Sequence, residues 1–385
     1  MNNMIAARIS SMSTSIFATM GKMAVEHNAV NLGQGFPDFD GPLWLMEEAF
    51  KAMKSGKNQY APSPGIISLR KRISEVQKKH YDMDYNPETE ITITAGATEA
   101  LYCAVCAFIN PGDEVVLFEP YYDAYQADVV LAGGVPVYVT LNKPDFTFDR
   151  DELLKAISSK TKMIIINSPH NPTGKVFSYE ELEFIAGVAI DNKLIVVSDE
   201  AYEFLTYVNV RHIPMASIPG MRNKTITVNS TGKTFGMTGW KIGYATASEQ
   251  LTTAIRKVHQ WTTFAVNTPA QHAVAYGFEI LDSYLPDFKQ LYQTKRDKAL
   301  SLLAETNFHA HQPKGSYFIM VDIPKGIFAD DVDAATKLVR DFKVATIPPS
   351  VFYTRSDEGK TMLRLCFAKT DETLESGIAI LKSVR

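Results

Sequence analysis

Ionisable side chains follow several apolar segments of this chain, close to the point where each segment ends. Asp199 comes directly after Leu194–Ser198, and Lys233 comes shortly after Thr225–Asn229. A lysine amine can bond covalently to an aldehyde, and a carboxylate at the end of an apolar segment needs a cationic partner if it is buried. These two residue types indicate chemistry on a carbonyl compound that also carries a positive charge.

The segments that must position these side chains alternate between short apolar runs and longer amphipathic runs from about residue 90 to 245. Some runs, such as Met163–Ile166, are continuously apolar, as in strands that are covered on both faces. The alternation predicts an α/β domain with a mostly parallel sheet, and helices at Thr98–Phe108 and at Glu180–Ile190 behind a capping box. Seven strands are predicted, at Ile91–Thr94, Glu114–Phe118, Val135–Val139, Met163–Asn167, Leu194–Ser198, Thr225–Asn229 and Ile242–Ala245.

The pattern changes after about residue 280, where a smaller α+β domain is expected. Its first four elements are predicted at Leu285–Glu305 (helix), Tyr317–Val321 (strand), Asp331–Phe342 (helix) and Met362–Phe367 (strand), before a last helix. We expect residues 1–40 to form an N-terminal arm and part of the small domain, residues 41–280 the large domain, and residues 281–385 the small C-terminal domain. Residues 1–25 lack acidic residues but also lack the apolar region of a signal peptide, so a surface arm is expected there.

Several familiar sites are excluded by spacing. Gly232-Lys-Thr resembles the end of a nucleotide-binding P-loop, but Thr227 stands where that loop needs its first glycine. Gly33-Gln-Gly35 begins like a dinucleotide fingerprint, but Asp38 stands at the third glycine position. Cys103 and Cys106 fall within a predicted helix, which favours packing over redox chemistry. The eight histidines show no ligand spacing, so no metal is expected.

Composition excludes further classes of function. The 385 residues carry 39 basic and 43 acidic side chains, a net charge of −4, which gives no bulk attraction for nucleic acid or anionic membranes. No run of about 18 apolar residues is present, so no membrane span is expected. Three cysteines cannot form an even disulfide framework, which indicates a reducing compartment and a cytoplasmic location.

The remaining polar residues are predicted to meet at one edge of the sheet, because ligands collect outside the carboxyl ends of parallel strands. They provide a lysine for an aldehyde, an aspartate for a ring nitrogen, and a helix start at Gly96–Thr98 for a phosphate. Pyridoxal 5'-phosphate (PLP) requires this combination, since its charged ring acts as an electron sink only while the nitrogen stays protonated. Lys233 is the residue expected to bond to the aldehyde, and Asp199 the partner of the ring nitrogen.

At these residues the sequence resembles the class I aminotransferases of PLP fold type I, in the branch of the kynurenine and glutamine transaminases. Within that branch it looks most like the bacterial methionine aminotransferases. The resemblance covers nearly the whole chain. It is carried by Asn31-Leu-Gly-Gln-Gly-Phe-Pro-Asp38, Asn58-Gln-Tyr-Ala-Pro62, Asn171-Pro-Thr-Gly174, Ser230-Thr-Gly-Lys-Thr-Phe-Gly-Met-Thr-Gly-Trp-Lys-Ile-Gly243, Lys257-Val-His-Gln260 and Arg364-Leu-Cys-Phe-Ala-Lys369.

The resemblance implies a role for each cofactor-binding residue. Ser230 and Lys241 match a phosphate-binding hydroxyl and cation, and Lys241 stands where many relatives have arginine. Gly96, Ala97 and Thr98 match the turn whose backbone amides hold the phosphate. Asn171 and Tyr202 match the pair that hydrogen bonds to the ring hydroxyl, and Tyr122 matches the aromatic residue stacked on the ring. Tyr60 and Phe264 match residues delivered by a neighbouring subunit, which implies a homodimer with shared active sites.

The resemblance also assigns the substrate side. Arg364 matches the arginine that binds the α-carboxylate, helped by Asn171 and by the backbone amide of Gly35. Enzymes of this group that act on dicarboxylic acids carry a second arginine after the lysine motif, whereas residues 258–291 contain only Lys289 as a basic residue other than histidine. We therefore expect a neutral substrate such as methionine, an aromatic amino acid or glutamine. Phe17 replaces a pocket tryptophan of kynurenine-type relatives, which argues against kynurenine.

The expected function is transfer of the α-amino group to a 2-oxo acid by a ping-pong mechanism, with the freed Lys233 amine as general base. One alternative on the same fold is a C–S β-lyase that cleaves cysteine conjugates. Another is a PLP-binding regulator without enzymatic activity. Such regulators carry an added winged-helix module, and we expect none here because the enzyme fold accounts for the 385 residues.

Overall fold

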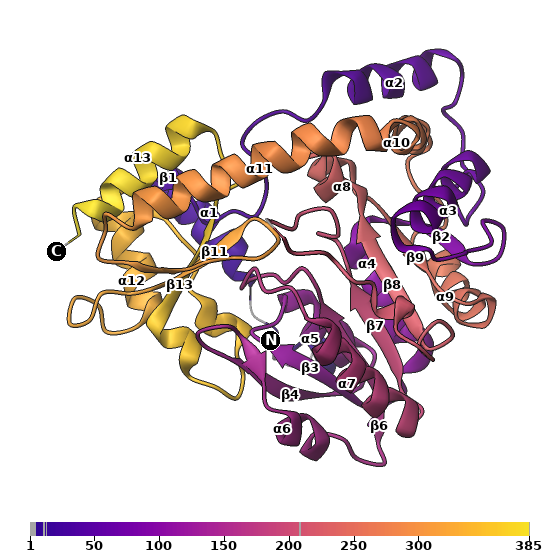
Figure 1. Ribbon diagram of the computed structural model, residues 1–385, viewed down its shortest axis with the longest axis horizontal. Helices are drawn as coiled ribbons and strands as arrows, with labels where there is room; N and C mark the ends of the chain where they lie inside the picture. Colours follow the sequence, from indigo (N-terminus) through magenta and orange to yellow (C-terminus); the bar gives the residue numbers. More distant parts are fainter. Residues whose placement is uncertain (1–4, 11, 13, 208, 385) are drawn as a thin grey trace.

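The computed structural model of the protein describes residues 5–10, 12, 14–207 and 209–384. Within these residues the largest element is a sheet of eight strands, which includes all seven predicted strands (Figure 1). The strand order across the sheet is β2 (Ile91–Ala95), β9 (Ile242–Thr246), β8 (Thr225–Ser230), β7 (Ile195–Asp199), β6 (Thr161–Asn167), β3 (Glu114–Glu119), β4 (Val135–Asn142) and β5 (Thr147–Phe148).

The centre of this sheet is parallel and its margins are antiparallel. Strands β8, β7, β6, β3 and β4 pair in parallel, whereas β9 is antiparallel to β2 and to β8. Strand β5 was not predicted. It is two residues long and antiparallel to β4, too short to leave a periodic signal in the sequence.

Both faces of the sheet are buried, as the continuously apolar runs predicted. On one face Val116, Ile164 and Val196 pack with side chains of α6 (Arg150–Lys155) and α7 (Tyr179–Asp191). On the other face Val115 and Ile165 pack with side chains of α4 (Gly96–Phe108), α5 (Asp123–Leu131) and α9 (Glu249–Thr262). Successive residues of each strand thus point to opposite helical layers.

The start of α7 shows how local sequence fixes the end of a helix. Ser178 Oγ accepts a hydrogen bond from the backbone N–H of Glu181 (3.2 Å), and Glu181 Oε2 accepts one from the N–H of Ser178 (2.9 Å). This is the predicted capping box, which satisfies two backbone donors that have no partner inside the helix.

A second group of strands lies beside the large sheet (Figure 1). In the described residues β10 (His309–His311), β11 (Phe318–Asp322) and β13 (Met362–Cys366) form an antiparallel sheet, and β1 (Val30–Asn31) pairs in parallel with β12 (Val344–Ala345). The helices on this side are α1 (Ile16–Glu26), α11 (Leu281–Leu303), α12 (Asp331–Lys337) and α13 (Asp371–Lys382). The helix predicted at Asp331–Phe342 changes to a π-helical turn at Leu338–Phe342.

The remaining helices are α2 (Leu43–Lys54), α3 (Ile67–Tyr81), the short α8 (Thr231–Thr234) and α10 (Thr268–Glu279). Helix α11 follows α10 and extends from the large sheet to the second group of strands (Figure 1). No helix in the described ranges has both the length and the apolar character needed to span a bilayer.

The expected N-terminal arm falls partly outside the described residues, at residues 1–4, 11 and 13. Residues 5–10 are exposed. Helix α1 then buries Met20 and Ala24, and it contacts β1 and β12. The chain therefore enters the second group of strands before it reaches the large sheet.

Candidate active site

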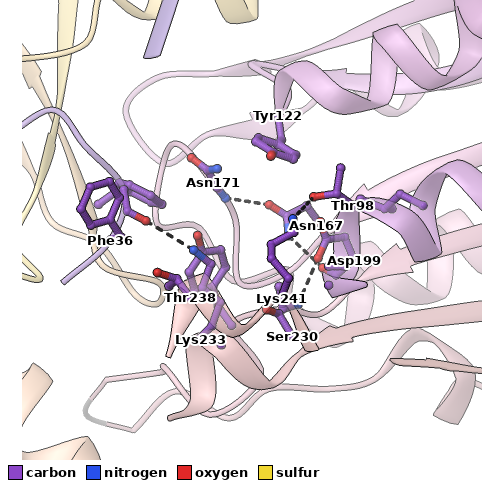
Figure 2. Close-up of a pocket in the computed structure, with 18 of the residues that line it drawn as sticks. Phe36, Thr98, Tyr122, Asn167, Asn171, Asp199, Ser230, Lys233, Thr238 and Lys241 are labelled. Carbon is purple, nitrogen blue, oxygen red and sulfur yellow. Dashed lines mark hydrogen bonds between the residues drawn. The ribbon is translucent and has the colours of Figure 1, made fainter. Parts of the chain in front are cut away.

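A cavity of about 240 Å³ lies outside the carboxyl ends of β6, β7 and β8 (Figure 2). It brings together every predicted site residue except Tyr60 and Phe264, namely Phe17, Gly35, Gly96, Ala97, Thr98, Tyr122, Asn171, Asp199, Tyr202, Ser230, Lys233, Lys241 and Arg364. Residues that are far apart in the sequence meet here because parallel strands end at the same edge of the sheet.

The lining is strongly cationic although the protein as a whole is slightly acidic. Among the described residues that line the cavity, Lys233, Lys241 and Arg364 are cationic and Asp199 is the one carboxylate. In Figure 2, Lys233 and Phe36 lie toward one side of the cavity, Thr98 and Lys241 lie toward the other, and Tyr122 lies above Asn171 and Asn167. Such a lining favours a ligand with more than one negative group.

Lys233 is in α8, the single turn that follows β8. Its Nζ donates hydrogen bonds to the hydroxyl of Tyr317 (2.8 Å) and to the carbonyl oxygen of Gly35 (3.3 Å). Burial lowers the pKa of the Lys233 amine to about 8. About a tenth of this amine is thus uncharged at pH 7, far more than for an ordinary lysine, and the uncharged form is the one that a nucleophile or a general base requires.

Asp199 is the last residue of β7 and is buried. Burial raises the pKa of its carboxyl to about 6, although hydrogen bonds from the Tyr125 hydroxyl to Oδ2 (2.7 Å) and from the Ala201 N–H to Oδ1 (3.0 Å) oppose the shift. Asn167 Nδ2 donates to the backbone oxygen of Asp199 (2.8 Å) and fixes the end of the strand. The raised pKa means that the charged carboxylate still needs a cationic partner.

The start of α4 forms the anion-binding part of the cavity. Gly96 has a φ of +74°, and a Cβ at this position would lie 3.2 Å from Lys241 Nζ. Lys241 Nζ donates a hydrogen bond to Thr98 Oγ1 (3.3 Å), so the cation lies at the first turn of the helix. Free N–H groups, a positive helix end and a lysine together suit a phosphate.

Arg364 comes from β13, in the second group of strands, and is buried. Its Nη1 donates to Asn171 Oδ1 (3.0 Å) and its Nη2 to the carbonyl oxygen of Gly33 (2.9 Å). Its Nε is buried without a hydrogen-bond partner in the described part of the chain. An incompletely paired buried guanidinium is costly, and a carboxylate from a ligand would supply the missing acceptor.

Aromatic rings form the wall around Arg364. The guanidinium carbon lies 4.2 Å from the ring centre of Phe318 and 4.9 Å from that of Phe17. The Phe17 ring in turn stacks on Phe352, with centroids 5.8 Å apart. The space beside the carboxylate-binding group is therefore apolar.

Tyr60 and Phe264 lie outside the cavity, on the surface. Their rings contact each other edge to face at 5.5 Å, yet the two residues are 83% and 49% exposed. Trp261, at the end of α9, is 85% exposed. Exposed aromatic rings of this kind are typical of a surface that another chain covers.

Asn167, Tyr125 and Tyr317 are among the residues that the structure places at the site and that sequence reasoning did not assign. Asn167 is the last residue of the predicted strand Met163–Asn167. Its side chain donates to the backbone oxygen of Asp199 and accepts from the N–H of Asn171 (2.7 Å). Tyr125 lies inside a helix and Tyr317 precedes a strand, so neither has a strand-end position that could mark it. Their contacts depend on tertiary structure alone.

Comparisons with known proteins agree with this geometry. Residues 27–381 match the family described as aminotransferase class I and II, and the chain belongs to that family. The N-succinyldiaminopimelate aminotransferase of Mycobacterium tuberculosis is 39% identical over 97% of both chains, and its solved structure superposes with a TM-score of 0.96, covering 99% of this chain and 100% of the other.

Two further relatives have other names. The methionine aminotransferase of Escherichia coli is 38% identical over 96% of this chain and 95% of its own length. Its structure gives a TM-score of 0.95, covering 98% of this chain and 99% of the other. The kynurenine–oxoglutarate transaminase of Dictyostelium discoideum is 37% identical over 95% of this chain and 93% of its own length. The predicted family and fold type are thus confirmed, and the protein is an aminotransferase that uses PLP.

The residues present fit this cofactor. The start of α4 suits the phosphate, because a Cβ at Gly96 would press against Lys241. The buried Asp199 forms no salt bridge within the described residues, and burial outweighs the effect of Lys233 on its pKa. When bound, PLP supplies an electron sink for the charge that develops at the α-carbon of an amino acid. The chain itself must bind, orient and deprotonate the substrate.

Proposed function

We propose that this protein transfers the α-amino group of a neutral amino acid to a 2-oxo acid in two half-reactions of a ping-pong mechanism. Methionine, an aromatic amino acid or a glutamine-like amino acid is the donor. One observation carries the choice of donor: the rings of Phe17 and Phe318 pack against the Arg364 guanidinium, and the two other cations of the described cavity lining, Lys233 and Lys241, are assigned to the cofactor. A side-chain carboxylate would enter an apolar space without a partner.

Each residue of the site has a role in this proposal. Ser230, Lys241 and the N–H groups of Gly96, Ala97 and Thr98 hold the phosphate of PLP. Asp199 pairs with the ring nitrogen, Asn171 and Tyr202 contact the ring hydroxyl, and Tyr122 packs on the ring. Lys233 would bond to the aldehyde of the cofactor in the resting enzyme, and its amine, when free, would accept the α-proton of the substrate at Nζ.

Substrate orientation decides which bond breaks. Arg364 and the N–H of Gly35 hold the α-carboxylate, and Tyr122 limits how the bound groups can tilt. A substrate whose α-carboxylate is fixed in this way would present its Cα–H bond to Lys233 Nζ. Proton loss is then favoured over loss of carbon dioxide.

A homodimer is part of the proposal, because Tyr60 and Phe264 are exposed in the single chain and would complete the site of a second copy.

The proposal also includes the division of the chain into an N-terminal arm (residues 1–40), a large domain (residues 41–280) and a small domain (residues 281–385), and a cytoplasmic location. The three cysteines, Cys103, Cys106 and Cys366, are free thiols, which suits a reducing compartment.

The donor is tested by mixing the PLP-loaded protein with single amino acids and recording the absorbance change of the half-reaction. We expect methionine, phenylalanine, tyrosine or glutamine to react at least tenfold faster than aspartate and glutamate. N-succinyldiaminopimelate, named for one relative, belongs in the panel because it carries several carboxylates. Faster reaction with any of these acidic compounds would contradict the neutral donor.

The role of Lys233 has its own test. Borohydride reduction of the loaded protein, followed by a tryptic map, should place the cofactor on Lys233. A map that places it on Lys241 would overturn the assignment.

The alternative of a cysteine-conjugate C–S β-lyase is separated by a third assay, because a lyase releases pyruvate when no 2-oxo acid acceptor is added.

A further inference from the structure

The hydroxyl of Tyr317 links the catalytic lysine to the segment that carries Gly35. Tyr317 lies just before β11 and is 1% exposed. Its hydroxyl donates a hydrogen bond to the carbonyl oxygen of Gly35 (2.7 Å) and accepts one from Lys233 Nζ (2.8 Å). Lys233 Nζ also donates to the same Gly35 oxygen (3.3 Å), so the three groups form a closed triangle.

The hydrogens in this triangle can be assigned from the groups themselves. The Tyr317 hydroxyl donates its proton to the Gly35 carbonyl oxygen, so the Tyr317 oxygen accepts the hydrogen bond from Lys233 Nζ. An uncharged amine has two N–H bonds and one lone pair. With both N–H bonds donated, to Tyr317 and to Gly35, the lone pair is left pointing away from these acceptors, on the side of the cavity that Lys233 lines.

The ring of Tyr317 is fixed by its neighbours. It stacks on Tyr292 with an interplanar angle of 22° and meets Tyr202 edge to face at 5.1 Å. A hydroxyl held on this side by packed rings can define one position for a long and flexible lysine side chain.

We propose that Tyr317 is a positioning residue that holds the Lys233 amine, whenever it is not bonded to the cofactor, with its lone pair toward the substrate α-carbon. This inference rests on the proposed function. The α-proton would move from the substrate α-carbon to Lys233 Nζ, which becomes an ammonium and would then give a proton to the bound cofactor. Tyr317 keeps its own proton throughout. Its bond to Gly35 joins the position of the base to the segment that binds the α-carboxylate.

Several charged or titratable groups face Lys233 from the elements packed around it. Asp199 comes from β7, Lys241 follows the turn at Thr238–Trp240, and Arg364 and Cys366 come from β13. Tyr202 lies beside the amine as well, with its ring centre 5.8 Å from Nζ. Replacement of Tyr317 by phenylalanine leaves all of these groups in place and removes one acceptor. A lost acceptor disfavours the ammonium form, so the amine should titrate at lower pH.

The test uses the Tyr317→Phe variant in cofactor-free and loaded form. Competitive acetylation of the cofactor-free protein over a pH series, read by mass spectrometry, gives the titration midpoint of Lys233. We expect the midpoint to fall by about half a pH unit or more. In the loaded enzyme kcat should fall about tenfold or more with a smaller change in KM. The acidic limb of the kcat–pH profile, where the base becomes protonated, should move to lower pH with the midpoint.

Tyr207→Phe is the matched control, since Tyr207 is a buried tyrosine whose hydroxyl donates to the Ser316 carbonyl outside the cavity. The proposal would be overturned if Tyr317→Phe and Tyr207→Phe had equal Lys233 titration midpoints and equal kcat values. It would also be overturned if Tyr317→Phe changed the thermal stability but neither the midpoint nor kcat. If Tyr317→Phe does not fold, 3,5-difluorotyrosine at position 317 keeps the ring and weakens the acceptor, and the midpoint should shift in the same direction. Absence of amino transfer by the parent protein would refute the proposed function, while the labelling of the cofactor-free protein would still decide the role of Tyr317.

Discussion

Tyr125 donates a hydrogen bond of 2.7 Å to Asp199 Oδ2, from inside helix α5 to the end of strand β7. Both groups are buried, and the bond is one of two that offset the burial of the carboxylate. A hydrogen bond to a charged group contributes more than a neutral one, about 1.5–3 kcal/mol. Tyr125 therefore helps to decide whether Asp199 is charged when the cofactor binds.

Tyr125→Phe should weaken cofactor binding. Without the phenol the pKa of Asp199 rises further above about 6, and less of the carboxylate is available to pair with a ring cation. We expect the apparent Kd for PLP at pH 7 to rise about tenfold. Equilibrium titration of cofactor-free protein measures it. Tyr121→Phe is the control, because its hydroxyl bonds to Gln126 and Thr354 and not to Asp199. Equal Kd values in both variants would contradict the role of Tyr125.

Asp199→Asn should change how stability depends on pH in the cofactor-free protein. The pKa of the carboxyl rises from 3.8 to about 6 on folding, so the folded state holds a proton that the unfolded chain releases earlier. As the pH rises from 4 to 7, this carboxyl therefore lowers the free energy of unfolding of the wild-type protein, by an amount on the order of 2 kcal/mol. The asparagine variant lacks this loss.

Denaturant unfolding at a series of pH values measures the difference between the two proteins. We expect the free energy of unfolding of Asp199→Asn to increase relative to that of the wild-type protein as the pH rises from 4 to 7. A difference in free energy of unfolding that does not change with pH would show that burial does not raise the pKa of this carboxyl. Turnover provides the second readout: both Asp199→Asn and Asp199→Ala should lose activity by about two orders of magnitude or more while the fold is retained.

The sequence predicts the parts of this molecule that follow local rules. The central strands are continuously apolar, and a sheet buried on both faces requires this. Asp199 follows from the rule that residues after such strands lie at the ligand edge, whereas the roles of Asn171 and Ser230 come from the family resemblance. Gly96 was found through the helix start, whose role depends on backbone N–H groups.

Tertiary neighbours were not predictable in the same way. The contact between Tyr317 and Lys233 joins residues 84 positions apart, and nothing at either position indicates the other. Tyr125 lies in a helix of ordinary composition. Strand β5 and the π-helical turn after α12 are too short for a periodic pattern. Their positions depend on packing across the fold.

Arg364→Lys should raise KM for every amino acid donor. Lysine keeps the charge but cannot form a fork, and it leaves Asn171 Oδ1 and the Gly33 carbonyl without their present donors. We expect kcat/KM to fall about 100-fold or more with each donor, as measured by half-reaction kinetics. Arg296→Lys serves as control, since Arg296 is a buried arginine paired with Asp297 outside the cavity. A loss confined to one donor would contradict the role of Arg364 as the general carboxylate site.

Complementation between two inactive variants tests whether the active sites are shared. Lys233→Ala lacks the base, and Tyr60→Asp places a carboxylate where a partner's phosphate is expected, so each homodimer should be inactive. In a mixed dimer, the Tyr60→Asp subunit keeps its own Lys233 and receives an intact Tyr60 from its partner. One of the two sites is then complete.

After subunit exchange at equal concentrations half of the dimers are mixed, so activity should recover to about a quarter of the wild-type value. A mixture of Lys233→Ala with Asp199→Asn is the control, because both changes fall in a subunit's own cavity and no complete site can form. Differently tagged chains report how much mixed dimer is present. If mixed dimers form and the Tyr60 pair recovers no more activity than the control pair, Tyr60 does not serve the neighbouring site, and the exposed Tyr60 and Phe264 rings need another explanation.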